Sequence, residues 1–197
     1  MCYNLSDCKR VQNCADRVHC KHSPKIELIK GDITQLKVDA IVNAANNSLL
    51  GGGGVDGAIH MKAGHELIEE CIKLNGCETG EAKITRGYGL PAKFVIHTVG
   101  PVYSRQEAEQ AKKLLTDCYQ NCFKLAKLNN VRTIAFPAIS CGVYGYPMGD
   151  ACKIALNTAV DILKEQFDIK KVIFILFSER ALNIYKTYFK TMCFQAQ

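Results

Sequence analysis

The sequence predicts an α/β protein whose mostly parallel sheet is covered by helices on both faces. Short apolar, β-branched runs alternate along the chain with longer segments in which apolar residues recur at helical spacing. Glycine-rich loops follow two of the predicted strands. Because strands that alternate with helices favour parallel crossovers, we expect ligands to bind beyond the carboxyl ends of the strands.

The expected strands are short and bounded by turn residues. Residues 38–42, Val-Asp-Ala-Ile-Val, are typical of a buried strand, and the turn at 89–91 separates two further strands. The predicted strands are 26–29, 38–43, 83–86, 93–99, 133–136 and 172–177.

The helices are predicted from apolar residues that repeat along one face. Ala151, Ala155, Ala159 and Ile162 form one such face. The predicted helices are 55–74, 106–128, 149–167 and 179–189.

Composition favours one globular domain. The chain has 197 residues, of which 48% are hydrophobic, and a formal net charge of +6. No apolar stretch approaches the ~18 residues of a membrane span, and no secretory signal is evident. We expect a cytoplasmic protein, with the nucleus as a second possible compartment, that is monomeric and binds neither membrane nor nucleic acid. The positive charge would help to attract an anionic ligand.

The 11 cysteines are odd in number, which favours free thiols over a disulfide framework. Cys2, Cys8, Cys14 and Cys20 repeat in a segment with little apolar content. Their spacing lacks the short pairs of structural zinc sites, so no metal site is predicted. We expect residues 1–24 to be a flexible, cysteine-rich extension and residues 25–197 to be the domain.

The segment 43–60, NAANNSLLGGGGVDGAIH, predicts an anion site. Four glycines between a strand and a helix let backbone amides approach a phosphate, and the helix N-terminus adds partial positive charge. An isolated glycine run would be a linker, but this one lies in a strand-loop-helix context. The segment lacks the Lys of a P-loop and the glycine spacing of a dinucleotide fingerprint. The expected ligand contacts are Gly52, Gly53, Gly54 and Val55.

Polar side chains cluster around this loop in the sequence. Asp56 and His60 are four residues apart and so share one helical face. Asn43 and Asn46 could bind ribose hydroxyls and a water, or could simply support a turn. His97 lies inside a predicted strand and is interpreted as structural.

A second glycine loop, Ser140 to Pro147, follows the strand 133–136. Gly142 and Gly145 permit a turn whose amides form another anion site, although an ordinary turn is an equal alternative. Cys141 lies in this loop beside its glycines, where a thiol of lowered pKa could act as a nucleophile. We interpret it as a packing residue.

Several ordered blocks resemble the macrodomain family, and in particular its MacroD-type branch. They are GDIT at 31–34, the segment 43–60, LNGCETGEAKITRGYGLPAKFVIHTVGP at 74–101 and AFPAISCGVYGYP at 135–147. The resemblance covers nearly all of residues 25–188. It implies a three-layer α/β/α domain, with a mixed, mostly parallel central sheet, that binds ADP-ribose. It also implies an enzyme that removes ADP-ribose from acidic side chains and deacetylates O-acetyl-ADP-ribose.

The resemblance also implies roles for individual residues. Asp32 would accept a hydrogen bond from the adenine amine, whereas its sequence context alone suggests a turn cap. Ile33 would contact the adenine ring, and Phe177 would pack on it or belong to the core. The loop around the diphosphate would comprise Ser140, Cys141, Gly142, Val143, Tyr144 and Gly145. Tyr146 would lie beside the distal ribose. Relatives usually carry Thr at position 141.

The resulting hypothesis is a metal-free hydrolysis of an ester at the distal ribose. Asn46 would position the ribose and a water, and Asp56 would orient that water or take its proton. The expected partners are ADP-ribose, O-acetyl-ADP-ribose and mono-ADP-ribosylated proteins, with no cofactor. Two alternatives stay open: a module that only binds ADP-ribose, and a phosphatase acting on ADP-ribose 1″-phosphate.

Overall fold

The computed structural model describes residues 25–165 and 168–195. The predicted extension, residues 1–24, lies outside the described residues. The strands are β1 (Ile26–Lys30), β2 (Ala40–Ala44), β3 (Ala82–Arg86), β4 (Phe94–Thr98), β5 (Thr133–Phe136) and β6 (Lys171–Leu176). The helices are α1 (Gly54–Ala63), α2 (His65–Leu74), α3 (Ala108–Leu128), α4 (Met148–Glu165) and α5 (Glu179–Gln195). Short 3-10 turns occupy Ile33–Gln35 and Tyr103–Arg105.

The strands form a six-stranded sheet in the order β1-β6-β5-β2-β4-β3. Every pair is parallel except β3 with β4, which are antiparallel neighbours. The expectation of a mixed, mostly parallel sheet is therefore confirmed. Because β2 lies between β4 and β5, the loops that follow these central strands emerge at one edge of the sheet.

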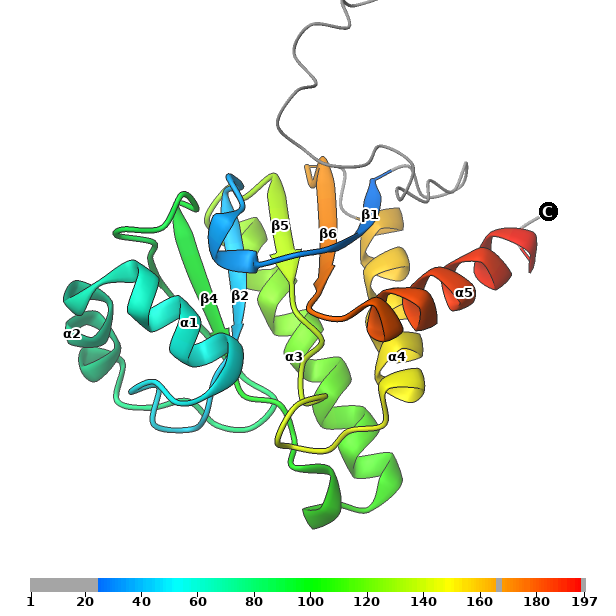
Figure 1. Ribbon diagram of the computed structural model, residues 1–197, viewed down its shortest axis with the longest axis horizontal. Helices are drawn as coiled ribbons and strands as arrows, with labels where there is room; N and C mark the ends of the chain where they lie inside the picture. The colour runs from blue at the N-terminus through cyan, green and yellow to red at the C-terminus, as the bar shows by residue number, and fades with distance from the viewer. Residues whose placement is uncertain (1–24, 166–167, 196–197) are drawn as a thin grey trace, which may run out of the picture.

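Helices cover both faces of the sheet, which gives three layers (Figure 1). Successive strand residues point to opposite faces, so Ile41 joins the core under α1 and α2 while Ala40 and Val42 join the core under α3, α4 and α5. The predicted three-layer architecture is confirmed.

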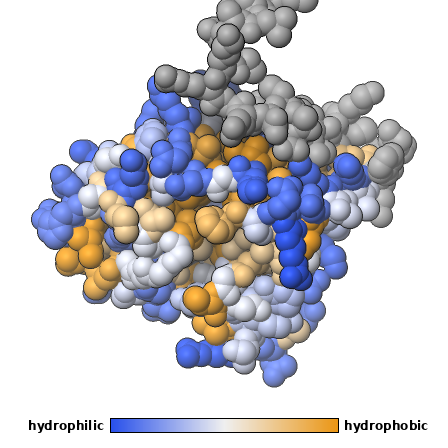
Figure 2. All heavy atoms as spheres, viewed as in Figure 1, coloured by the Kyte–Doolittle hydropathy of each residue, from blue (hydrophilic) through white to orange (hydrophobic). Residues whose placement is uncertain are grey.

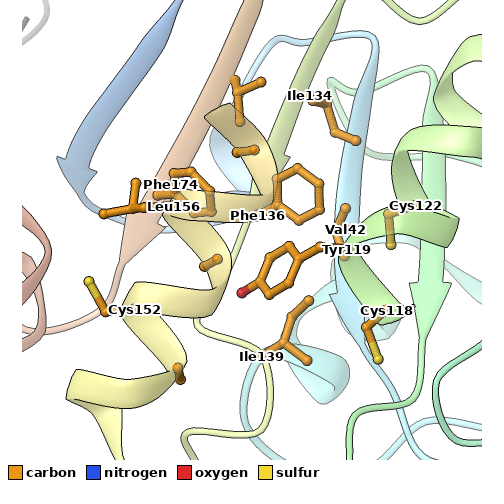
Figure 3. Packing of buried hydrophobic residues seen from close by; sticks show 14 of the residues in the cluster. Val42, Cys118, Tyr119, Cys122, Ile134, Phe136, Ile139, Cys152, Leu156 and Phe174 are labelled. Atoms are coloured by element: carbon orange, nitrogen blue, oxygen red, sulfur yellow. The ribbon is translucent and has the colours of Figure 1, made fainter. Parts of the chain in front are cut away.

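The larger core is built on aromatic contacts between α3 and the sheet. The ring of Phe136 on β5 lies 5.3 Å from that of Tyr119 and 5.7 Å from that of Phe174, and all three side chains are fully buried (Figure 3). Offset aromatic packing of this kind adds to the stabilisation from apolar burial. It holds the loop after β5 on a rigid base.

The predicted helix 55–74 is wrong in one respect, because it is two helices. Gly64 ends α1 with φ 95, a conformation that glycine adopts without strain, and α2 starts at the next residue. The helix predicted at 149–167 spans Met148–Glu165, and positions 166–167 lie outside the described residues. The last helix continues to Gln195, beyond its predicted end at 189.

Most described cysteines agree with the expectation of free thiols. Those with free thiols are Cys71, Cys77, Cys118, Cys122, Cys141 and Cys152. Cys193 departs from the expectation, since it is disulfide-bonded. Among the described residues, none of the helices is long and apolar enough to cross a bilayer.

Candidate functional site

The candidate site lies at the carboxyl ends of the parallel strands. The loop between β2 and α1 and the loop between β5 and α4 both leave the lower edge of the sheet (Figure 1). Figure 2 shows the molecule from the same side as Figure 1: hydrophobic residues gather near the centre and at the lower left, and hydrophilic residues lie at the upper left and on the right. The two glycine-rich loops therefore follow strands β2 and β5, which are parallel neighbours in the sheet.

The first loop is shaped by Asn46. Its Oδ1 accepts hydrogen bonds from the backbone N and the hydroxyl of Ser48, at 3.0 and 2.6 Å, and its Nδ2 donates to the carbonyl of Gly51 at 2.8 Å. Gly51 and Gly54 have φ of 86 and 62, which other residues adopt only with strain. Asn46 therefore ties the loop into a fixed curve, and its amide supports the loop backbone.

Two glycines let the loop lie close to α1. A Cβ on Gly57, inside α1, would be 2.5 Å from the carbonyl oxygen of Gly52, and a Cβ on Gly52 would be 3.0 Å from Asp56 Oδ2. Gly53 and Gly54 face open space. The exposed amides at the start of α1 are thus free to meet an anion, and the helix N-terminus favours negative charge there.

Asp56 is buried beneath this loop, with 3% of its surface exposed. Its Oδ1 accepts a hydrogen bond of 2.7 Å from Nδ2 of Asn43, which is fully buried at the end of β2. A buried carboxylate needs such donors, since leaving it without one is costly. The structure therefore brings together three predicted site residues, because His60 Nε2 also lies 3.5 Å from Asp56 Oδ1.

His97 on β4 belongs to the same network, which the sequence interpretation missed. Its Nδ1 lies 3.1 Å from Asn43 Nδ2, and its Nε2 lies 2.9 Å from the hydroxyl of Thr85 on β3. Burial, together with the nearby His60, lowers the pKa of His97 to about 3. His97 is therefore neutral near pH 7. The sequence did contain a signal for this network, because a polar histidine inside an otherwise apolar strand needs hydrogen-bond partners.

His60, Cys71 and His97 form a set that could in principle hold a metal ion. Their ligand atoms lie within 4.8 Å of one another, and a His and Cys set suits Zn²⁺. However, both nitrogens of His97 are already engaged, and burial raises the pKa of Cys71 to about 11, so this thiol keeps its proton near neutral pH. We therefore interpret the set as a hydrogen-bonded support beneath Asp56.

The second loop is held by an unusual backbone at Ser140. Its φ is 63, and its carbonyl accepts from the backbone N of Tyr146 at 2.9 Å. A Cβ on Gly100, which follows β4, would collide with Ser140 Oγ. Gly145 has φ 68 and donates to the carbonyl of Gly142 at 3.0 Å. The loop is therefore a tight turn that depends on Gly100.

The side chains of this loop point in different directions. Val143 is 98% exposed and Tyr144 is half-buried, with its carbonyl accepting from Tyr103 N. Cys141 is partly buried, and burial raises the pKa of its thiol to about 12, which argues against a nucleophilic role. The loop offers backbone groups to a ligand more readily than reactive side chains.

Comparison with known proteins agrees with this geometry. The family profile described as Macro domain matches residues 42–155, which is more than half of the chain.

The chain belongs to the macro domain family.

Relatives of this macro domain include bacterial and animal proteins. A macro domain-containing protein of Chlorobaculum tepidum is 59% identical over 82% of this chain and 93% of its own length. ADP-ribose glycohydrolase MACROD2 of Xenopus laevis is 56% identical over 82% of this chain, which spans only 39% of that longer protein. The Trypanosoma brucei macrodomain in complex with ADP-ribose has a TM-score of 0.80 and 45% identity, covering 84% of this chain and 69% of its own.

The other strand ends of the macro domain carry the residues expected at an adenine. Asp32 Oδ1 accepts from the backbone N and hydroxyl of Thr34, at 2.9 and 2.8 Å, so the turn-cap interpretation describes its present contacts. Burial would raise the pKa of Asp32, but these hydrogen bonds lower it overall. Ile33 is buried in the smaller core, whereas Phe177 is 92% exposed after β6 and so is not a core residue.

Tyr146, at the end of the second loop, is almost fully buried. It is 5% exposed, belongs to the larger core and packs against Tyr103 with ring centroids 4.8 Å apart. It also lines a groove of about 560 Å³ between α3 and α4, in the helix layer opposite to α1. The backbone N of Tyr146 also donates to the carbonyl of Ser140, so the turn that starts at Ser140 closes at Tyr146.

Proposed function

We propose that this macro domain is an ADP-ribose-binding hydrolase that releases ADP-ribose from ester links to protein Asp or Glu side chains and from acetate. The observation that carries the proposal is Asp56, buried under the first glycine loop and held there by Asn43. A module that only binds ADP-ribose would need the two loops but no buried carboxylate beside them. The similarity to proteins named ADP-ribose glycohydrolase gives the proposal further support.

ADP-ribose would lie across the carboxyl ends of the strands. The diphosphate would bind the amides of residues 52–55 and 142–145, where glycines permit close approach. Adenine would pack on the exposed ring of Phe177 and beside Ile33, and the second carboxylate oxygen of Asp32 would accept from its amine. Tyr144, half-buried in the second loop, would replace Tyr146 as the aromatic next to the distal ribose.

Hydrolysis would proceed by attack of water on the ester carbonyl. The water oxygen bonds to the carbonyl carbon, the bond from that carbon to the ribose oxygen breaks, and the ribose oxygen takes up a proton. Asp56 would orient the water or accept its proton, and His60 would adjoin that carboxylate. The α-phosphate could share the proton. Binding energy from the adenosine half would hold the ester in place.

The scheme assigns Asn46 a supporting role. Since its amide already holds Ser48 and Gly51, Asn46 would position the loop that carries the diphosphate and, through it, the ribose. No metal ion takes part in the scheme. The working unit would be a monomer in the cytoplasm or nucleus, and its partners would be mono-ADP-ribosylated proteins and O-acetyl-ADP-ribose.

The experiment is a comparison of three substrates with the full chain. Wild type is incubated with a protein carrying ADP-ribosyl-glutamate, with O-acetyl-ADP-ribose and with ADP-ribose 1″-phosphate, and products are resolved by chromatography. We expect release of ADP-ribose from both esters, and at least a 100-fold lower rate for Asp56→Ala with ADP-ribose still bound. Asp150→Asn is the matched control, because Asp150 also lies in the first turn of a helix but is exposed.

Two results would reject the proposal in favour of an alternative. Tight binding of ADP-ribose by wild type without turnover of either ester would support a binding module. Phosphate release from the 1″-phosphate as the dominant activity would support a phosphatase. Unchanged ester turnover by Asp56→Ala would contradict the role given to Asp56.

A further inference from the structure

The amide of Asn43 has only one orientation that satisfies its neighbours. Its nitrogen lies 2.7 Å from Asp56 Oδ1 and 3.1 Å from His97 Nδ1. The reversed orientation would place the amide oxygen against a carboxylate oxygen, where two acceptors repel each other. Both amide hydrogens therefore point at these two partners, and His97 Nδ1 must be an acceptor.

This arrangement fixes the tautomer of His97. With Nδ1 accepting, the ring hydrogen is on Nε2 and is donated to the hydroxyl of Thr85, 2.9 Å away. The Thr85 hydroxyl then donates to the carbonyl of Arg86, at 3.2 Å, which ends the chain of donors. Within the described part of the chain, the titratable side chains recorded beside His97 are His60 from α1, with ring centroids 6.2 Å apart, and Cys71 from α2, whose Sγ lies 3.7 Å from Nε2. Because burial also keeps the ring neutral, Nδ1 stays an acceptor near pH 7.

One consequence concerns the oxygen of Asn43. Among the described residues Asn43 Oδ1 has no hydrogen-bond partner, although the residue is fully buried. An unpartnered buried acceptor costs free energy, and a donor supplied by a ligand hydroxyl or a bound water would recover it. The hydrogen bonds that hold Asn43 Nδ2 against Asp56 and His97 thus leave Asn43 Oδ1 available to accept a hydrogen bond from a ligand or a water.

We propose that His97 and Thr85 are positioning residues that lock the Asn43 amide, so that its nitrogen holds Asp56 and its oxygen is left to receive a hydroxyl of the distal ribose or the attacking water. The proposal rests on the proposed function, since Asp56 is the group that is positioned. Without the lock, the amide could rotate between its partners. Asp56 would then sample positions from which it cannot direct the water.

The hydrogen-bond chain can be tested without any substrate. Protein labelled with ¹⁵N-histidine is measured by long-range ¹H–¹⁵N correlation between pH 5 and pH 8, and His97 is assigned with His97→Gln. We expect the neutral form with the hydrogen on Nε2 throughout this range. A hydrogen on Nδ1, or a charged ring, would overturn the proposal.

Thr85 supplies the kinetic test. Thr85→Val keeps the shape but removes the acceptor for Nε2–H, while Thr85→Ser keeps the hydroxyl. With the ADP-ribosyl-glutamate substrate we expect kcat to fall at least fivefold in Thr85→Val, with KM and the Kd for ADP-ribose within twofold of wild type. Thr85→Ser should restore most of kcat. Thr98→Val is the matched control, because Thr98 is buried on β4 but donates to the Glu81 carbonyl instead.

The outcomes separate this proposal from the proposed function. Unchanged kcat in Thr85→Val, or an equal loss in Thr85→Ser, would overturn the positioning role while wild-type turnover still supports the hydrolase. A wild type that turns over neither ester would overturn the hydrolase, and with it the positioning role, even where the tautomer of His97 is as expected.

Discussion

Asn43 at the end of β2 and Asp56 in the first turn of α1 are joined by a fully internal hydrogen bond of 2.7 Å. The two residues are the ends of the glycine loop, so this bond closes the loop at its base. It also gives the buried carboxylate a hydrogen-bond donor from within the protein. The side-chain amide of Asn43 therefore links the shape of the loop to the position of the Asp56 carboxylate.

Replacing Asn43 with Ala should affect both stability and turnover. The change leaves Asp56 and His97 without their shared donor, and we expect a loss of about 2 kcal/mol in the free energy of unfolding. Ester turnover should fall at least tenfold. Urea denaturation at pH 7 and initial rates measure the two effects. Asn157→Ala is the control, because Asn157 is exposed. Its side-chain amide hydrogen-bonds only to the hydroxyl of Tyr188 within the described part of the chain. Equal stability of the two variants would contradict the role of Asn43.

Gly57→Ala should weaken ADP-ribose binding. Its new Cβ would lie 2.5 Å from the carbonyl oxygen of Gly52, so the loop or the helix must shift. We expect the Kd for ADP-ribose to rise at least tenfold by calorimetry, because the loop amides lose their alignment. Gly149→Ala is the matched control: it also lies in a helix, but its Cβ would meet nothing within 4 Å. An unchanged Kd in Gly57→Ala would show that the loop adapts freely.

The positions of most strands and helices were predictable because their signals are local. The runs at β2 and β5 are apolar and β-branched, as expected for strands covered on both faces, and their predicted bounds differ from the observed ones by at most two residues. The division between α1 and α2 was missed because Gly64 interrupts an otherwise continuous apolar repeat. A single glycine inside such a repeat is often tolerated, and only its φ of 95 reveals the break.

The site was predictable only where its residues are close in sequence. Helical spacing brings His60 to Asp56, and the structure places them in contact. His97 reaches Asn43 because β2 and β4 are parallel neighbours in which these two residues are register partners. Strand order and register arise from tertiary packing, which no local pattern specifies. The burial of Tyr146 in the larger core was likewise not predicted, because it too depends on tertiary packing.

The two tyrosines of the second loop should respond differently to substitution. Tyr146→Ala removes a buried ring from the larger core, and we expect a loss of about 3 kcal/mol in unfolding free energy. Tyr144→Ala should change stability by less than about 1 kcal/mol but raise KM for the ester substrate. Urea denaturation and steady-state kinetics on both variants test the distinction. Stability loss in Tyr144→Ala with none in Tyr146→Ala would reverse the assignment.

Cys141 should be dispensable for chemistry. Burial raises the pKa of its thiol to about 12, so the thiolate that a nucleophilic mechanism requires is scarce at pH 7 to 8. We expect Cys141→Thr, which is nearly the same size, to keep ester turnover within threefold of wild type. Iodoacetamide at pH 8 should likewise label Cys141 slowly, as judged by peptide mass spectrometry. A 100-fold loss of turnover in Cys141→Thr would restore the nucleophile hypothesis.

Asp39 should make stability depend on pH in the acid range. Burial would raise the pKa of Asp39, but hydrogen bonds from Lys93, Thr133 and Arg132 bring it down to about 2. A carboxyl group whose pKa is lower in the folded state stabilises the protein above its unfolded pKa, near 3.8, and this contribution disappears as pH falls through about 2.

Asp39→Asn should therefore lose about 2 kcal/mol of unfolding free energy at pH 7, and the difference from wild type should shrink steadily below pH 4. Urea denaturation at a series of pH values measures this. The matched control is Asp161→Asn, whose carboxylate is largely exposed and paired only with Lys164 one helical turn away among the contacts described, so its removal should change stability little at any pH. The carboxylate of Asp39 links the start of β2 to β5, and its contribution to the unfolding free energy must fall when it is protonated. If wild type and Asp39→Asn differed in unfolding free energy by the same amount from pH 7 down to pH 2.5, the loss would come from packing and not from the charge.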